Sequence, residues 1–544
     1  MAAILAKVVA LLLPLHWAHL ALRRQGIPKA SSGNPLAASA PWKRRDLHRL
    51  GQADCEALGG IFYFRILGFN CVQISDPWLA AEVLELGSRR PDLVDKPRGL
   101  PLPIYDCFDR GTSDPPQPSM ISAAASDPLW RVIRKGVAPA FSAPNIRRAF
   151  AAVEEVTGRL LARLREHGAQ RLLDLDGALM CHALDVIGKV AFSRDFKATM
   201  DLNGPGAAAC RMIKEICAVG VDDMRNPLRP ILRAMPFLPE AWTYRRRTLA
   251  LTRSVQALMR DLAEEVHARG ARSEEEDPTV AGHLMRVRDA AGRPLPFTRL
   301  WSEISIVFMA GMETTGHTIS WTLYLVSQHP AVEARLAAEL DAAGLLLTRA
   351  RPRPRALAHA DLGRLTYLQS VVKEAQRLFS VAPLVVRRAL RDVRVGQYDV
   401  PAGTCLLLHV YAMHTTSANW SQPAEFLPER WLESDAEYAR WPPEGGPAET
   451  GPASHCSPDP EASWQGGQTR ARRFMPFLEG SRQCVGMSLA RMTTATTVAA
   501  LLSCFTFRLS DDMGGPEGVR ASEAYYVTIQ PAEGLRMHAI PRPC

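Results

Sequence analysis

The feature that most constrains this chain of 544 residues is the stretch 474–490, which places one cysteine in a glycine-bounded turn. Gly480 and Gly486 flank Cys484, and a long apolar run rich in alanine and threonine follows. Such a run is typical of a helix, so the cysteine would lie at a helix N-terminus, where N–H groups and the macrodipole lower the pKa of a thiol. The glycines allow a tight turn and leave room for a flat group. The stretch therefore predicts a thiolate presented to a flat ligand.

Arg482, two residues before the cysteine, offers a fixed cation to an acidic group of that ligand. A single cysteine is more commonly just buried in a turn. Here Phe477, Gly480, Arg482, Cys484 and Gly486 match one pattern together, which chance would produce in such a chain on the order of once in ten thousand times. The pattern resembles the haem-binding loop of the cytochrome P-450 haem-thiolate monooxygenases. The resemblance implies haem b (iron protoporphyrin IX) as cofactor and Cys484 as the axial ligand of its iron, since thiolate ligation favours O–O cleavage.

A long apolar stretch, residues 301–328, carries the motif Ala-Gly-Met-Glu-Thr-Thr at 310–315. As a membrane span it would bury Glu313 and His317 in lipid at high cost, so we expect a central helix of the protein interior. The residues alone leave Glu313 either an internally paired acid or a proton relay beside the hydroxyl of Thr314. The motif resembles that of the family's long central helix. This resemblance implies that Glu313 and Thr314 are the catalytic pair that relays protons during oxygen activation.

Several cations are candidates to hold the haem propionates. Trp130 and Arg134 are four residues apart and would share a helix face, from which an indole N–H and a guanidinium can hold one carboxylate. The commoner meaning of such a pair is a half-buried tryptophan beside a solvated arginine. The family pattern implies that both bind a propionate, and that Arg387 and Arg482 do so too. Arg388, next to Arg387, is an alternative for that position.

Glu374 and Arg377, three residues apart on a predicted helix, would alone be a surface ion pair of small worth. In this chain they resemble the Glu-x-x-Arg pair that ties the family's core to a later arginine, here Arg430. The implied role of the three is structural, because they would hold the segment leading to Cys484. The chain departs from the family after His414, where an Arg-Asp-Pro usually follows, and this leaves the role of the histidine open.

The expected fold is mainly α with small β-sheets (α+β), the cytochrome P-450 fold, with haem between the long central helix and the helix after the cysteine loop. Residues 60–75 predict two strands, and 146–272 are mainly helical in pattern. Residues 398–404 predict a turn between two short strands. Residues 524–540 predict a hairpin whose tip, near 531–534, reaches the cavity.

We expect three parts along the chain. Residues 1–24 are a hydrophobic N-terminal anchor or a transit segment, and residues 25–44 are a Pro/Ser/Gly-rich linker. Residues 45–544 are the catalytic domain, with an insertion at 433–471. The insertion has too little apolar periodicity to offset the entropy of ordering, so we expect it to be disordered.

The apolar stretch near the N-terminus is about as long as the ~20 residues of a bilayer span, and Arg23-Arg24 after it favour a cytoplasmic main body. We therefore expect the endoplasmic reticulum membrane, cytoplasmic face. The lack of acidic residues before Asp46 leaves a plastid as the alternative. The 11 cysteines show no paired spacing, which favours a reducing compartment.

The net charge of +9 fits a membrane surface or an acidic protein partner better than nucleic acid. An NADPH-dependent diflavin reductase is the expected redox partner with an anchor, and a ferredoxin with a plastid location. The predicted docking face consists of Arg131, Lys135, Arg472, Arg473 and Arg491.

The resemblance implies a monooxygenase that inserts one oxygen atom from O2 into a lipophilic small molecule. One alternative is a haem-thiolate isomerase or dehydratase acting on lipid hydroperoxides, and another is a non-catalytic, membrane-tethered haem-binding protein. Retention of the acid–alcohol pair Glu313 and Thr314 argues against both. Sterols, fatty acids, carotenoids and other terpenoids all remain open as substrates.

Overall fold

The computed structural model describes residues 27–29, 45–66, 69–96, 115–168, 172–225, 239–432 and 473–543. The expected anchor and insertion lie outside these residues, as does most of the expected linker. Among the helices of the described residues, none combines the length and the apolarity that crossing a bilayer requires.

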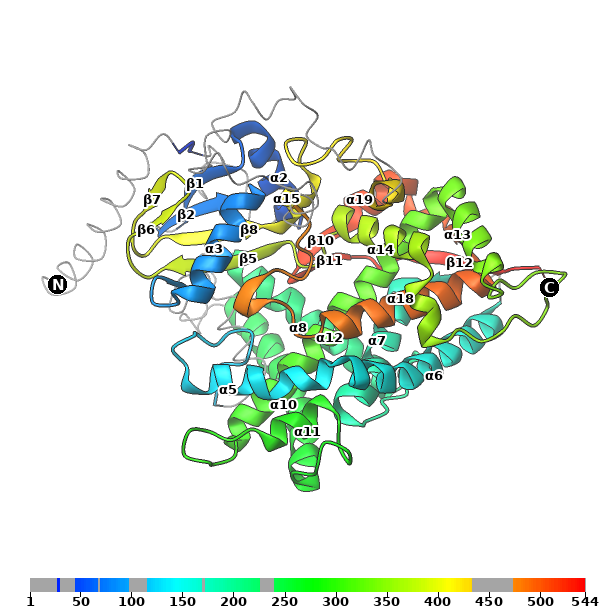
Figure 1. Cartoon of the computed structure of the whole chain (residues 1–544), viewed down its shortest axis with the longest axis horizontal. Coiled ribbons are helices and arrows are strands. Elements are labelled where there is room, and N and C mark those ends of the chain that lie inside the picture. Colours follow the sequence, from blue (N-terminus) through cyan, green and yellow to red (C-terminus); the bar gives the residue numbers. More distant parts are fainter. Residues whose placement is uncertain are drawn as a thin grey trace, which may run out of the picture.

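Three helices form the centre of the molecule: α7 (Leu175–Phe192), α12 (Phe297–Gln328) and α18 (Met487–Cys504). α12 packs along α7 and also contacts α18 (Figure 1). It begins four residues before the expected start, and most of its residues are buried on all sides, Glu313 and His317 included. The expectation of an interior helix is therefore confirmed. The other described α-helices are α2 (Leu47–Leu58), α3 (Pro77–Arg89), α5 (Pro128–Val137), α6 (Ala143–His167), α8 (Pro205–Arg225), α10 (Pro239–Arg269), α11 (Val280–Arg286), α13 (Pro330–Ala342), α14 (Thr366–Leu378), α15 (Val410–Thr415) and α19 (Gly515–Ser522).

Short 3₁₀ helices connect several of these elements. They are η3 (Ala138–Phe141), η4 (His359–Gly363), η5 (Pro428–Trp431), η8 (Gly480–Arg482) and η9 (Asp511–Met513).

The larger sheet has the strand order β1-β2-β8-β5-β3 and lies at the upper left in Figure 1, away from α5, α10 and α11. Only β2 and β8 pair in parallel within it. Its strands are β1 (Ile61–Ile66), β2 (Phe69–Ile74), β3 (Val94–Asp95), β5 (Leu384–Ala389) and β8 (Cys405–His409). Three smaller sheets contain β6 (Val393–Val395) with β7 (Tyr398–Val400), β10 (Glu523–Tyr526) with β11 (Thr528–Pro531), and β4 (Leu173–Asp174), β12 (Arg536–Pro541) and β9 (Phe505–Leu509).

Capping residues fix where the helix that carries Trp130 and Arg134 begins. The carboxylate of Asp127 accepts the N–H of Leu129 at 2.8 Å, and Pro128 takes the first helical position, where no N–H is needed. Asp127 also accepts from Arg299 of α12 at 2.7 Å. α5 is therefore held against the central helix at its first turn.

One prediction about turns was right only in part, and a second was wrong. Tyr398–Val400 is itself a strand, so the turn covers only Pro401–Thr404, before β8. The C-terminal hairpin turns at Val527, where Tyr526 pairs with Thr528, and not at 531–534. Val527 has a φ of 79°, a conformation in which a β-branched residue is unusual. Because a valine and not a glycine occupies this position, the turn could not be recognised in the sequence. Gly534 lies instead against the carboxylate of Asp174, where a Cβ would clash.

Candidate haem site

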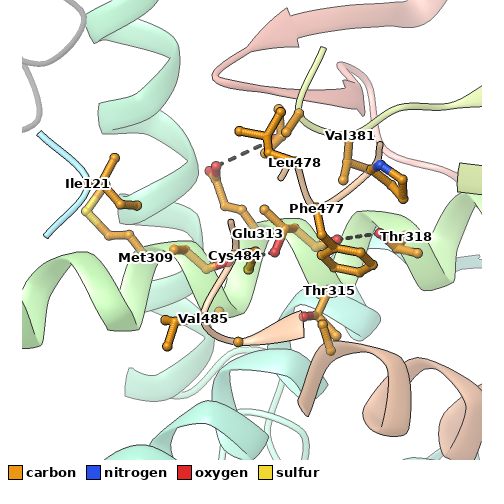
Figure 2. Close-up of a pocket in the computed structure, with 18 of the residues that line it drawn as sticks. Ile121, Met309, Glu313, Thr315, Thr318, Val381, Phe477, Leu478, Cys484 and Val485 are labelled. Atoms are coloured by element: carbon orange, nitrogen blue, oxygen red, sulfur yellow. Dashed lines mark hydrogen bonds between the residues drawn. The ribbon is translucent and has the colours of Figure 1, made fainter. Parts of the chain in front are cut away.

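A cavity of about 400 Å³ lies between α12 and the loop that contains Cys484. Figure 2 shows Met309, Glu313 and Thr315 on α12, with Cys484 and Val485 on the loop. The sulfur of Cys484 is exposed to this cavity, although protein surrounds it on its other sides. The lining is mainly apolar. The hairpin turn at Val527 also reaches it, in place of the tip that the sequence predicted.

The loop around Cys484 is closed by backbone contacts. The N–H of Cys484 donates to the carbonyl of Phe477 at 2.9 Å. Gly480 has a φ of 74°, and a Cβ there would collide with the hydroxyl of Ser88 on α3. The N–H of Ser481 donates to the same hydroxyl at 2.9 Å. The glycine is therefore required both for the turn and for its contact with α3.

The sign of the thiol's pKa shift differs from the prediction. Burial raises the pKa of Cys484, while the N–H of Gly486 and the charge of Arg134 lower it by less. α18 begins only at Met487, so a single backbone N–H reaches the sulfur. The loop alone therefore favours a thiol. A metal cation on the sulfur reverses this preference, because it stabilises the thiolate directly.

The four predicted propionate ligands differ in where they point. Arg134 lines the cavity and donates to the carbonyl of Gln483, next to the cysteine. Trp130 donates its indole N–H to the carbonyl of Met120 at 3.1 Å. The guanidinium of Arg482 stacks 3.5 Å from the centre of the Trp130 ring and also lines the cavity. The tryptophan therefore positions Arg482, and its own N–H is engaged by a backbone carbonyl.

Arg387 and Lys96 complete a cationic end of the site. Arg387 is buried and donates to the carbonyl of Val386 at 3.0 Å. Lys96 lines the cavity, and its pKa is well below the usual value because of burial and because Arg387 and Arg482 repel its charge. Asp95 accepts from Arg482 at 3.3 Å. Lys96 could not be predicted from the sequence, since a lysine beside an aspartate matches no spacing pattern.

This end of the cavity fits a group with two carboxylates. A buried lysine repelled by two arginines marks a region of positive potential, which an anionic ligand would relieve. The thiol faces the same cavity from the loop, and the lining between is apolar. Haem b has these requirements: one axial iron ligand, an apolar slot and cations for two propionates.

Glu313 and Thr314 lie on the opposite side of the cavity. The hydroxyl of Thr314 donates to the carbonyl of Ala310 at 2.7 Å, and Thr318 does the same to Thr314. Glu313 accepts weakly from the hydroxyl of Thr528 at 3.5 Å, and its other oxygen is buried without a hydrogen-bond partner among the described residues. Burial raises the pKa of this carboxyl. The acid is therefore biased toward its protonated form beside an alcohol.

Comparison with known proteins gives the family. The cytochrome P-450 family model matches residues 35–521. This chain is a cytochrome P-450. It is 23% identical to Protein LUTEIN DEFICIENT 5, chloroplastic, of Arabidopsis thaliana over 88% of this chain and 71% of that protein. It is 29% identical to Ent-cassadiene C11-alpha-hydroxylase 1 of Oryza sativa subsp. japonica, over 75% of this chain and 73% of that protein.

A third relative is Carotene epsilon-monooxygenase, chloroplastic, of Arabidopsis thaliana, at 25% identity over 72% of this chain and 66% of that protein. The family and these relatives establish a haem-containing monooxygenase with the α+β fold of the cytochromes P-450, as the sequence predicted. Members of the family use O2, lipophilic substrates and a redox partner.

In this P-450 the structure brings Glu374, Arg377 and Arg430 into one buried cluster. Glu374 accepts from Arg377 at 2.8 and 3.0 Å and from Arg430 at 2.9 Å. It also accepts the indole N–H of Trp431 at 2.8 Å. Although burial alone would raise the pKa of Glu374, the two arginines lower it. The cluster ties α14 to the segment around η5, which precedes the cysteine loop in the chain.

Proposed function

We propose that this P-450 holds haem b with the thiolate of Cys484 on its iron and oxidises a lipophilic molecule in the remaining space of the cavity. The observation that carries the proposal is the position of Cys484 opposite Glu313 and Thr314 across one apolar cavity with a cationic end. When bound, haem supplies the reductive activation of dioxygen.

The cations of the cavity bind and orient the cofactor. Arg134, Arg482 and Lys96 line the cavity and would neutralise the propionates, and Trp130 keeps the guanidinium of Arg482 in place. Arg387 is not among the residues that line the cavity, but its charge acts on Lys96 and adds to the positive potential. Neutralisation by propionates would also restore an ordinary pKa to the buried lysine, because an opposite charge favours the ammonium form.

Glu313 and Thr314 supply protons on the substrate side. The raised pKa favours a proton on the Glu313 carboxyl in a setting from which the apolar lining excludes bulk water. The Thr314 hydroxyl donates to Ala310, so its oxygen is free to accept from a donor in the cavity. This arrangement suits controlled delivery of protons, one at a time.

The test is the spectrum of the reduced protein under carbon monoxide. The wild type should give the red-shifted Soret band of thiolate ligation, and Cys484→Ser should lose it while keeping its far-ultraviolet circular dichroism. Cys504→Ser is the matched control, because Cys504 is buried at the far end of α18 and does not line the cavity. A normal Soret band in Cys484→Ser would overturn the assignment of the ligand.

The source of the inserted oxygen separates the monooxygenase from the isomerase alternative. With NADPH, a supplied reductase and oxygen-18 dioxygen, a monooxygenase product carries the label. An unlabelled product formed from a lipid hydroperoxide alone, without NADPH, would favour the isomerase.

We propose that an acidic redox partner docks beside the cysteine loop. Arg131, Lys135 and Arg491 are exposed there, whereas Arg473 is partly buried and Arg472 lies outside the described residues. We propose attachment to the endoplasmic reticulum membrane through residues 1–24, with a diflavin reductase as partner. A plastid with a ferredoxin is the second candidate, favoured by the chloroplastic names of two relatives. A fluorescent protein fused after residue 44 would distinguish the two locations.

A further inference from the structure

A row of polar side chains begins one helical turn after Glu313, and none of its members lines the cavity. His317 is one helical turn after Glu313, and its Nδ1 lies 2.8 Å from Oδ1 of Asp176 on α7. The other carboxylate oxygen of Asp176 accepts from Nζ of Lys214 on α8 at 3.0 Å. Ser320 donates to Asp176 at 2.9 Å. His317 and Asp176 are fully buried, while the side chain of Lys214 is 28% exposed. This row of side chains therefore ends at the protein surface, at Lys214.

The hydrogen-bond partners of the His317 ring determine which of its nitrogens exchanges a proton. Burial alone would raise the pKa of Asp176, but His317 and Lys214 lower it far below the usual value, so the carboxylate stays ionised. An ionised carboxylate only accepts hydrogen bonds, and Nδ1 of His317 must therefore carry a hydrogen. Nε2 is left as the nitrogen that gains or loses a proton.

At the end of this row nearest Glu313, two buried polar atoms lack a hydrogen-bond partner among the described residues. They are Nε2 of His317 and Oε1 of Glu313. Buried polar atoms are nearly always hydrogen-bonded, directly or through water. The two residues are four apart on α12, which makes them neighbours on one face, and the charge of His317 lowers the pKa of Glu313. Because the two atoms make no direct hydrogen bond to each other, one bridging water is expected to join Nε2 to the carboxyl.

The charges of the surrounding groups are consistent with one exchangeable proton shared by Glu313 and His317. Asp176 is balanced by Lys214, with Asp174 as a further acid near both. The charge of Lys214 also acts on Glu313 and lowers its pKa. The thiol of Cys217 on α8 and the hydroxyl of Thr528 on β11, which contact Glu313, are neutral. A neutral imidazole beside a carboxylic acid and an imidazolium beside a carboxylate have the same total charge. A proton can thus move between the two without placing a net charge in the interior.

We propose that His317, held by Asp176 and Lys214, is a proton-exchanging partner of Glu313 that reloads its carboxyl. The inference rests on the proposed role of Glu313. Insertion of one atom of dioxygen releases the other as water and consumes two protons, so a carboxyl that gives one proton must regain it. In the reloading step the Nε2–H bond of the imidazolium breaks and an O–H bond forms on Glu313. The imidazole stays neutral with its Nδ1–H on Asp176. Nε2 then regains a proton from the water expected between it and Glu313, because the nitrogen that faces Asp176 already carries a hydrogen.

The first experiment is an infrared pH titration of the ferric holoenzyme. The carboxyl C=O band of Glu313 is identified by its loss in Glu313→Gln. In the wild type the carboxyl band and an imidazole band should change in one common step, because the pair shares a proton. In His317→Gln the midpoint of the carboxyl band should move to higher pH, since the charge of His317 lowers the pKa of Glu313. A carboxyl band that titrates independently of any imidazole band in the wild type would overturn the proposal without any variant having to fold.

The second experiment measures coupling, as product formed and hydrogen peroxide released per NADPH consumed. His317→Gln should slow product formation by roughly tenfold and raise the peroxide yield, less than the loss of a full acid–base group, which is ~100-fold or more. His182→Gln is the matched control, because His182 is also fully buried but its ring hydrogen-bonds, among the described residues, only with the hydroxyls of Thr157 and Thr497.

The variants test the role of Glu313 and the role of His317 separately. Normal coupling in Glu313→Gln would contradict the proposed role of Glu313 itself. Uncoupling in Glu313→Gln together with wild-type behaviour in His317→Gln would contradict only the role of His317. Equal losses in His317→Gln and His182→Gln would mean that the effect is structural, and would also overturn the proposal.

Discussion

Nε2 of His414 accepts the backbone N–H of Met475 at 3.0 Å, across 61 residues of sequence. Its Nδ1 lies 2.7 Å from the hydroxyl of Ser380, and its own carbonyl accepts from Arg377. Burial lowers the pKa of His414 to about 3, so the ring is neutral and can accept. The histidine whose role the sequence left open therefore joins the Glu374 cluster directly to the start of the cysteine loop.

Three buried histidines should make the protein sensitive to acid. Burial lowers the pKa values of His182, His409 and His414 from 6.5 to about 3. The unfolded state then binds more protons between these values, so stability falls as the pH decreases from about 6.5, by about 1.4 kcal/mol per pH unit for each histidine. His414→Gln should reduce this slope by one histidine's share in urea unfolding. An unchanged slope in His414→Gln, equal to that of the exposed control His267→Gln, would contradict the prediction.

Glu374→Gln should destabilise the protein strongly. It leaves two buried guanidinium groups without their carboxylate, and breaking such a buried pair costs about 3–5 kcal/mol. The control is Glu155→Gln, because Glu155 is half-exposed where it pairs with Arg159 and Lys189, and the loss should be less than about 1 kcal/mol. Both are measured as urea midpoints, and haem content per protein should fall only in Glu374→Gln. Equal urea midpoints for the two variants would show that the Glu374 cluster does not stabilise the fold more than a surface ion pair does.

Glu313→Gln should separate stability from function. Because burial raises the pKa of Glu313, the native state holds this proton more tightly than the unfolded state, and the carboxyl's contribution to stability falls as the pH rises through that range. A neutral amide removes this penalty, so thermal unfolding at neutral pH should be unchanged or occur at higher temperature. Coupling of NADPH to product should nevertheless drop by ~100-fold or more, as expected for a lost acid–base group. A lowered unfolding temperature would mean that Glu313 is a structural acid.

Gly311→Ala should loosen the contact between α12 and α7. A Cβ at this position would lie 2.6 Å from Cδ1 of Ile187, so the glycine is needed for helix packing and not only for the approach of a ligand. The overpacking should cost about 1–3 kcal/mol. Ile187→Ala in the same chain should recover part of the loss, giving a coupling energy of about 0.5–3 kcal/mol in a double-mutant cycle. Additive losses in the double variant would show that the two side chains do not compete.

Reversing charge on the proposed docking face should slow reduction. Arg131→Glu with Lys135→Glu removes two exposed cations of α5 without touching the cavity lining. The rate of haem reduction by an acidic partner should fall, most at low ionic strength, because steering by charge is screened by salt. The haem spectrum should not change. Reduction at the wild-type rate would exclude this face.

The sequence located the groups whose chemistry depends on a few consecutive residues. The loop around Cys484 and the acid–alcohol pair on α12 were predicted from contiguous motifs, and the Glu374 pair from its helical spacing. The turns of the smaller sheets were predicted less well. Val527 adopts a positive φ, which is usually found at glycine, so the hairpin's turn can be located only from the strand pairing.

The family, the fold class and the side chains that face one another across the cavity could all be predicted from the amino-acid sequence, because local motifs encode them. The electrostatics could be known only from the folded protein: the raised pKa of Cys484, the cation Lys96 at the cavity, and the contact of His317 with Asp176. Each of these depends on burial and on partners far away in the chain. Desolvation and long-range contacts exist only once the chain has folded, and no spacing along the sequence records them.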